Sequence, residues 1–191
     1  MNFFYTTTSK GGKLIKQPLG GIPAYSVFNI TGVSDTGKSL MVEQFTVQQA
    51  KKGNKVAFIT VEAPANFLVA GLKLRAQAMG YDFEKFEDNI ILIDAASYGS
   101  LRDNIPELLS TLAYVIQNYK VKFTVIDSVT GLFENREMLA RVVVRQIFNF
   151  LKKMVSNSFT CITKKEVGMK SLQQKLLVDM QLDTLLMEQL Y

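Results

Sequence analysis

The stretch TGVSDTGKSL, residues 31–40, places a lysine and a serine directly after a glycine. From Gly32 to Ser39 it fits the pattern G-x-x-x-x-G-K-[ST], whose glycines let successive backbone N–H groups point at one anion. An apolar run at residues 26–30 precedes it and residues with helical spacing follow it, so the positive end of a helix faces the same anion. We interpret the stretch as a phosphate-binding loop. A glycine-rich turn in which Ser39 caps the helix is the alternative.

Each part of this loop has an expected role. We expect Lys38 to reach the β- and γ-phosphates of a nucleotide and count it among the catalytic residues. The hydroxyl of Ser39 is expected to ligate Mg²⁺. The expected nucleotide contacts are Gly32, Val33, Ser34, Asp35, Thr36, Gly37, Lys38, Ser39 and Leu40.

Two apolar runs end in an aspartate that could anchor the metal. FTVID ends at Asp127 and IILID ends at Asp94. The carboxyl ends of strands are where α/β sheets bind ligands. We favour Asp127 as the metal ligand because Ser128 follows it and the polar-tipped stretch GLFEN comes next. Asp94 stays as a rival, and an acid at a strand end can also be a simple turn or helix cap.

Glu62 is the candidate general base. It ends KVAFITVE, the run that follows the helix of the phosphate loop, and in a parallel sheet that end lies beside the γ-phosphate. A solvated loop acid is the alternative. The chain contains no histidine, so acid–base chemistry falls to Asp, Glu, Lys or Tyr.

The composition bounds the remaining possibilities. With no histidine and with Cys161 as the only cysteine, Ser-His-Asp triads, internal disulfides and CxxC zinc sites are excluded. A length of 191 residues and 48% hydrophobic content predict one domain over residues 1–191. No apolar run reaches about 18 residues and the start is polar, so we predict no membrane segment and a cytoplasmic protein. A net charge of +5 allows nucleic-acid or phosphate partners.

The order of elements predicts an α/β fold. Short β-rich runs alternate with segments of helical period, which implies βαβ crossovers and a mainly parallel sheet flanked by helices. Gly53 and Gly80 mark two helix ends, and Pro64 opens a helix. The predicted strands are residues 26–31, 55–61, 90–94, 123–128, 159–163 and 184–188.

Three stretches in this order resemble the KaiC-like branch of the RecA-superfamily ATPases: LGGIPAYSVFNITGVSDTGKSL, KVAFITVE and FTVIDSV. This branch includes archaeal RadA-paralogue proteins and the archaellum motor protein. The resemblance covers roughly residues 11 to 165. It implies a RecA-like P-loop core of three α/β/α layers, ATP with Mg²⁺, and a homo-oligomer, commonly a hexameric ring with nucleotide between subunits.

The chain departs from this family pattern at three places. Ala63 stands where a second glutamate often follows Glu62, which implies slower hydrolysis or full reliance on Glu62. Thr163, Lys164 and Lys165 replace a polar γ-phosphate sensor; Lys164 can contact phosphate or be solvated. The tail LLVDMQLDTLLMEQLY resembles the sixth-strand region but ends early, so the domain is expected to be incomplete at its carboxyl end.

Basic residues gather late in the chain. They can complete a neighbouring subunit's site, contact nucleic-acid phosphates, or line the polar faces of helices. No aromatic-interleaved basic loop marks a single-strand groove, so DNA is a weak prediction. The residues are Arg136, Arg141, Arg145, Lys152, Lys153, Lys164, Lys165, Lys170 and Lys175.

Four functions are compatible with these features. The first is a Mg²⁺-dependent oligomeric ATPase, in DNA recombination or repair or in regulation. The second is an ATP-bound scaffold with little turnover that controls a partner machine, as in archaellum motor proteins. The others are a recombination accessory protein related to RadA, and self-phosphorylation, for which no acceptor residue is marked.

Overall fold

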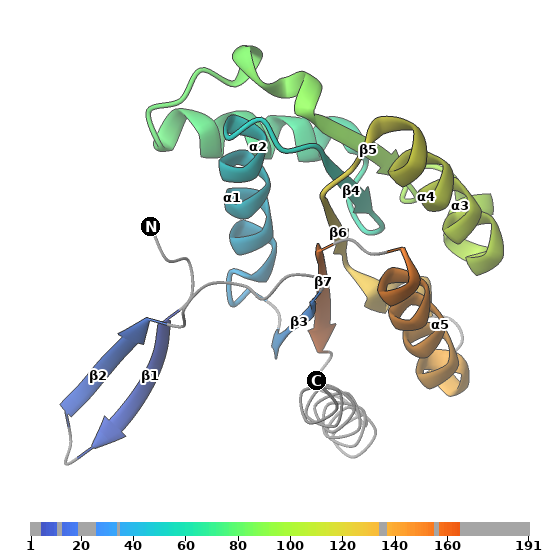
Figure 1. Ribbon diagram of the computed structural model, residues 1–191. Helices are drawn as coiled ribbons and strands as arrows, with labels where there is room; N and C mark the ends of the chain where they lie inside the picture. Colours follow the sequence, from blue (N-terminus) through green and yellow to red (C-terminus); the bar gives the residue numbers. More distant parts are fainter. Residues whose placement is uncertain are drawn as a thin grey trace.

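The chain contains a five-stranded parallel sheet in the order β3-β7-β6-β4-β5 (Figure 1). The computed structural model describes residues 5–10, 13–18, 26–33, 35–133, 137–154 and 157–164. The strands are β3 (Val27–Val33), β4 (Val56–Thr60), β5 (Ile90–Asp94), β6 (Phe123–Asp127) and β7 (Asn157–Lys164). Strand β7 lies between β3, which leads into the phosphate loop, and β6, which ends at Asp127.

Helices cover both faces of this sheet. Helices α1 and α2 pack on one face, whereas α4 and α5 pack on the other (Figure 1). The helices are α1 (Lys38–Lys51), α2 (Ala65–Ala78), α3 (Gly99–Asp103), α4 (Ile105–Tyr119) and α5 (Ala140–Lys153), with 3₁₀ turns η1 (Phe83–Lys85), η2 (Glu87–Asn89), η3 (Val129–Leu132) and η4 (Glu137–Leu139). The α/β fold with a parallel sheet between helix layers is confirmed.

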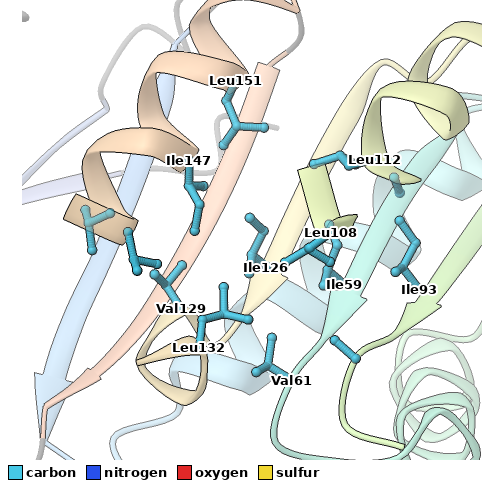
Figure 2. Packing of buried hydrophobic residues seen from close by; sticks show 14 of the residues in the cluster. Ile59, Val61, Ile93, Leu108, Leu112, Ile126, Val129, Leu132, Ile147 and Leu151 are labelled. Atoms are coloured by element: carbon cyan, nitrogen blue, oxygen red, sulfur yellow. The ribbon is translucent and has the colours of Figure 1, made fainter. Parts of the chain in front are cut away.

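Alternation along the strands divides the core in two. In β4, Val56 and Phe58 face α1 and α2, while Ala57 and Ile59 face α4 and α5. All of these side chains are fully buried, as expected for a parallel strand covered on both faces. Figure 2 shows the second cluster, in which Ile59 and Ile126 of the sheet meet Leu108 of α4 and neighbouring residues of η3 and α5.

Glycines end two helices as the sequence predicts. Gly53 and Gly80 have φ angles of 80° and 71°, the left-handed conformation that a glycine adopts without a Cβ penalty. Helix α1 ends two residues before Gly53, and α2 ends two residues before Gly80. Pro64 directly precedes α2.

The predicted strand positions are confirmed to within two residues where the structure describes them. The predicted strand at residues 184–188 lies outside the described residues. Sequence reasoning missed an antiparallel hairpin of β1 (Tyr5–Lys10) and β2 (Lys13–Pro18), although Gly11-Gly12 between two runs is a hairpin signal. In the described part of the chain, none of the helices has the length and apolar character needed to cross a bilayer.

Candidate nucleotide site

The carboxyl ends of the parallel strands place the candidate site residues at one edge of the sheet. The phosphate loop leaves β3, Asp127 ends β6, and Glu62 follows β4. Strands β4 and β6 are direct neighbours, and the Val61 N–H donates to the Asp127 carbonyl at 2.9 Å. Residues far apart in the sequence thus come together through strand order.

Two described residues of the loop have left-handed backbone conformations. Asp35 and Gly37 have φ angles of 60° and 84°. Gly32 lies so close to the loop that a Cβ there would be 2.9 Å from the Thr36 hydroxyl. Alternating left-handed residues before a helix turn backbone N–H groups toward one point, which makes a concave anion site. The loop therefore fits a phosphate group.

Lys38 is held against this loop. Its residue is buried, at 8% exposure, and its Nζ donates to the Thr36 hydroxyl at 3.3 Å. Ser39 and Leu40, the next residues of α1, are exposed. The ammonium group beside the loop would supply positive charge where a polyphosphate carries negative charge.

A pocket of about 400 Å³ joins the loop to Glu62. The exposed Glu62 side chain is the only lining residue that the pocket receives from outside the loop and the start of α1, among the residues that the structure describes. The lining residues are Asp35, Thr36, Gly37, Lys38, Ser39, Leu40 and Glu62. A carboxylate and a phosphate loop thus share one cavity.

Asp127 lies on the same side of the sheet as α1. It continues the alternation of Phe123 and Val125, which face α1 and α2, and it is half-buried. The peptide bond from Asp127 to Ser128 is cis. The buried Ser128 hydroxyl donates to Oε1 of Glu62, so the ends of β6 and β4 are also joined through side chains.

Glu43 is a carboxylate near this site that sequence reasoning missed. It lies one helical turn beyond Ser39 on α1, and its Oε2 is 3.5 Å from Arg75 Nε of α2. Burial raises the pKa of Glu43 above its ordinary value; Arg75 opposes this rise and the negative charge of Asp127 adds to it. Its position four residues after Ser39 could have indicated that both side chains lie on the same face of the helix.

Asp94, the rival metal ligand, has a structural role. Its Oδ2 accepts the Ala65 N–H at the start of α2 at 3.0 Å, and its Oδ1 accepts the Ser97 N–H at 2.8 Å. Partial burial acts to raise the pKa of Asp94, but these N–H donors outweigh it and the pKa lies below its usual value. Asp94 caps α2 and the turn after β5 instead of facing the loop.

The residues present fit a magnesium ion held in the manner of a phosphate loop. Such a site takes one hydroxyl and one carboxylate from the protein, while water and phosphate oxygens complete the octahedron. Ser39, in the first turn of α1, and Asp127, at the end of β6, would supply this pair. Across the described ranges, no group of three or more histidine, cysteine or acidic residues forms a metal cage, and this type of site does not need one.

Several predicted contacts lie outside what the structure describes. Ser34, Lys165 and Arg136 are outside the described residues, and only the backbones of Val33 and Lys164 are described. These two backbones are paired, which places the end of β7 between the phosphate loop and Asp127. On α5, the late basic residues Arg145, Lys152 and Lys153 are exposed, as expected for a polar helix face.

The resemblance seen in the sequence is borne out by comparison with known proteins. A family model described as "ATPase: KaiC" matches residues 8–177. This chain belongs to the KaiC ATPase family. The described sheet, with a strand between the phosphate-loop strand and the Asp127 strand, is consistent with the RecA-like core expected for the family.

Curated relatives of this KaiC-family chain include bacterial and archaeal proteins. The circadian clock oscillator protein KaiC 1 of Synechocystis is 27% identical over 155 residues, covering 77% of this chain and 29% of that protein. A UPF0273 protein of Sulfurisphaera tokodaii is 31% identical, covering 67% of this chain and 49% of its own length. A UPF0273 protein of Methanocaldococcus jannaschii is also 31% identical, over a region that covers 74% of this chain and 61% of that protein. The chain spans less than two thirds of each of these relatives.

Proposed function

We propose that this KaiC-family domain binds ATP with Mg²⁺ and hydrolyses it. The observation that carries the proposal is the pocket shared by the phosphate loop and Glu62, beside the strand that ends at Asp127. A phosphate loop alone would support binding. The carboxylate in the same cavity adds a group that can take a proton from water.

The proposed roles follow from the positions of the residues. Lys38 and the loop N–H groups hold the phosphates, and Ser39 and Asp127 hold the metal. Mg²⁺ held by these two residues would neutralise negative charge that develops on the phosphates during transfer. Glu62 orients a water molecule and accepts its proton as the water oxygen bonds to the γ-phosphorus, and ADP leaves.

An oligomer is part of the proposal. Phe67 and Leu74 of α2 are 67% and 60% exposed, and α2 begins three residues after Glu62. Large apolar side chains exposed on one helix mark a surface that another protein can cover. A second copy seated there would lie next to the nucleotide pocket, as in the ring that the family resemblance implies.

A scaffold that binds ATP with little turnover is the second candidate. Ala63, which follows Glu62, is exposed and carries no carboxylate, so Glu62 is the one acid that this strand end offers to the pocket among the described residues. A role in DNA recombination, repair or regulation stays a prediction from the resemblance.

Steady-state ATP hydrolysis with Mg²⁺ tests the proposal. We expect Glu62→Gln to lower kcat by about 10² to 10⁴-fold, the usual contribution of a general base, while ATP binding persists. Lys38→Ala is expected to weaken ATP binding itself. Glu84→Gln, at an exposed acid of η1, is the matched control and should leave both unchanged.

The two candidates give different results. Tight ATP binding with negligible turnover in both the parent and Glu62→Gln would support the scaffold. Full turnover in Glu62→Gln would contradict the assignment of the base, and unchanged ATP binding in Lys38→Ala would contradict the phosphate site.

A further inference from the structure

We propose that Ser128 is a positioning residue that holds Glu62 in the orientation needed to activate water. The inference rests on the proposed function, in which Glu62 is the general base. The contact that carries it is the hydrogen bond from the Ser128 hydroxyl to Oε1 of Glu62.

The two partners differ sharply in exposure. Ser128 is 0% exposed, whereas Glu62 is exposed and lines the nucleotide pocket. An exposed glutamate would sample several rotamers, at the cost of the geometry that proton transfer needs. A buried donor that engages one carboxylate oxygen restricts these rotamers and leaves the second oxygen to accept a proton from water.

The segment that follows Ser128 is packed against the end of β4. Directly after Ser128, the turn η3 packs against the end of β4, and Figure 2 shows Val129 and Leu132 beside Val61. A Cβ on Gly131 would lie 2.7 Å from Val61 Cγ1 and 3.4 Å from Glu62 Cγ. The absence of a Cβ at Gly131 therefore lets η3 approach the end of β4 and Glu62 closely.

This arrangement links the metal ligand to the base. Ser128 follows Asp127 directly, and the Asp127 carbonyl accepts the Val61 N–H at 2.9 Å. The strand that offers a carboxylate to the metal therefore also supplies the hydroxyl that orients the base. The end of β6 therefore influences both the orientation of Glu62 and the position of the Asp127 carboxylate.

Ser128→Ala removes the hydroxyl without adding bulk, and Ser128→Cys keeps a side chain there but donates weakly. We expect each to lower kcat for ATP hydrolysis by about 10- to 100-fold, with KM for ATP within about threefold of the parent. The control is Thr124→Val, which removes another fully buried hydroxyl from β6 that has no hydrogen-bond partner among the described residues. It should leave kcat unchanged.

A double variant separates positioning from a general structural effect. If Ser128 acts through Glu62, Ser128→Ala should cause little further loss of kcat in a Glu62→Gln background. Crystal structures of the nucleotide-free variants give a second readout. Glu62 should occupy several rotamers in Ser128→Ala and one in Thr124→Val.

Each outcome is decisive. Unchanged kcat in Ser128→Ala, fully additive losses in the double variant, or a single Glu62 rotamer without the hydroxyl would overturn the inference while leaving Glu62 as the base. Full turnover in Glu62→Gln would overturn the assignment of Glu62 as the base, and the role of Ser128 with it. A parent chain that does not hydrolyse ATP would overturn the proposed function itself. Thermal unfolding midpoints identify any variant that has lost its fold, and the conclusion then rests on Ser128→Cys.

Discussion

At the scale of single residues, backbone conformation shapes the candidate site as much as side-chain chemistry does. Gly37 adopts φ 84° at the start of α1, which turns the chain from the loop into the helix. Lys38 follows at once and is buried against the loop. The left-handed glycine and the adjacent lysine therefore act together, since the first orients backbone N–H groups and the second adds a positive charge.

Replacing Gly37 with alanine should separate this backbone role from general strain. Gly37→Ala and Gly53→Ala both force a Cβ into the left-handed region, at φ 84° and 80°, and both new methyl groups meet open space. Each should destabilise the fold by about 1–2 kcal/mol. In an ATP titration, only Gly37→Ala should also weaken affinity, by about tenfold or more. An equal loss of affinity in Gly53→Ala would contradict the role of the loop.

Glu43 gives a pH-dependent prediction. Because burial raises its pKa in the folded state, the stability linked to Glu43 is present at low pH and is lost as pH rises through the folded pKa. Glu43→Gln removes this charge, so the variant should gain in unfolding temperature relative to the parent between about pH 4 and pH 7. Thermal unfolding of the nucleotide-free chains measures it, with Glu84→Gln as control. A relative loss over this range would show that the Arg75 ion pair dominates.

At the scale of elements, two strands with the same sequence character have different tasks. Both β5 and β6 are apolar runs that end in aspartate, but β5 is at the edge of the sheet and β6 is beside β4 in its interior. The carboxylate of Asp94 caps the neighbouring helix α2. Asp127 instead lies at the end of β6, on the face of the sheet that α1 covers. Strand order, which no local pattern specifies, decides between them.

The capping role of Asp94 can be measured. Asp94→Ala should lower the free energy of unfolding by about 0.5–2 kcal/mol at pH 7, the usual cost of losing a helix cap. Since the pKa of Asp94 is lowered by folding, its stabilisation is present above the ordinary aspartate pKa and is lost as pH falls through the folded pKa. The parent and the variant should therefore converge below about pH 4.

Denaturant unfolding at several pH values tests this expectation. Asp88→Ala, at an exposed acid of η2, is the matched control and should change stability little at any pH. A large loss of ATP turnover in Asp94→Ala without a loss of stability would instead favour Asp94 as a metal ligand.

At the scale of the whole molecule, large apolar side chains are exposed on both faces of the sheet. Helix α2, which follows Glu62, presents Phe67 and Leu74. On the opposite face, exposed side chains of α4, η4 and α5 are Tyr114, Tyr119, Met138, Leu139 and Val142. The proposed contact between copies needs an apolar surface near the nucleotide, and α2 supplies it.

Phe67→Asp should shift the oligomer toward monomer in sedimentation velocity with ATP. In the assembled state the new carboxylate would be buried in an apolar contact without a partner, which disfavours association. Because Phe67 is exposed in the single chain, the substitution should have little effect on folding. Tyr114→Asp, at 61% exposure, is the matched control and should leave the assembly unchanged. A parent chain that stays strictly monomeric with ATP would contradict the ring.

The amino-acid sequence alone predicted the phosphate loop, the succession of strands and helices along the chain, and the strand-end acids, because these are local patterns that extend over a few residues. It predicted helix ends at Gly53 and Gly80 for the same reason. It missed Glu43 and the contacts that Ser128 and Gly131 make with the end of β4, because these neighbours lie in distant segments of the sequence. The three-dimensional structure was needed to show that Asp94 accepts an N–H at the start of α2 and that Ser128 donates to Glu62. Both depend on which parallel strands are neighbours, and hydrogen bonding between distant segments settles that order.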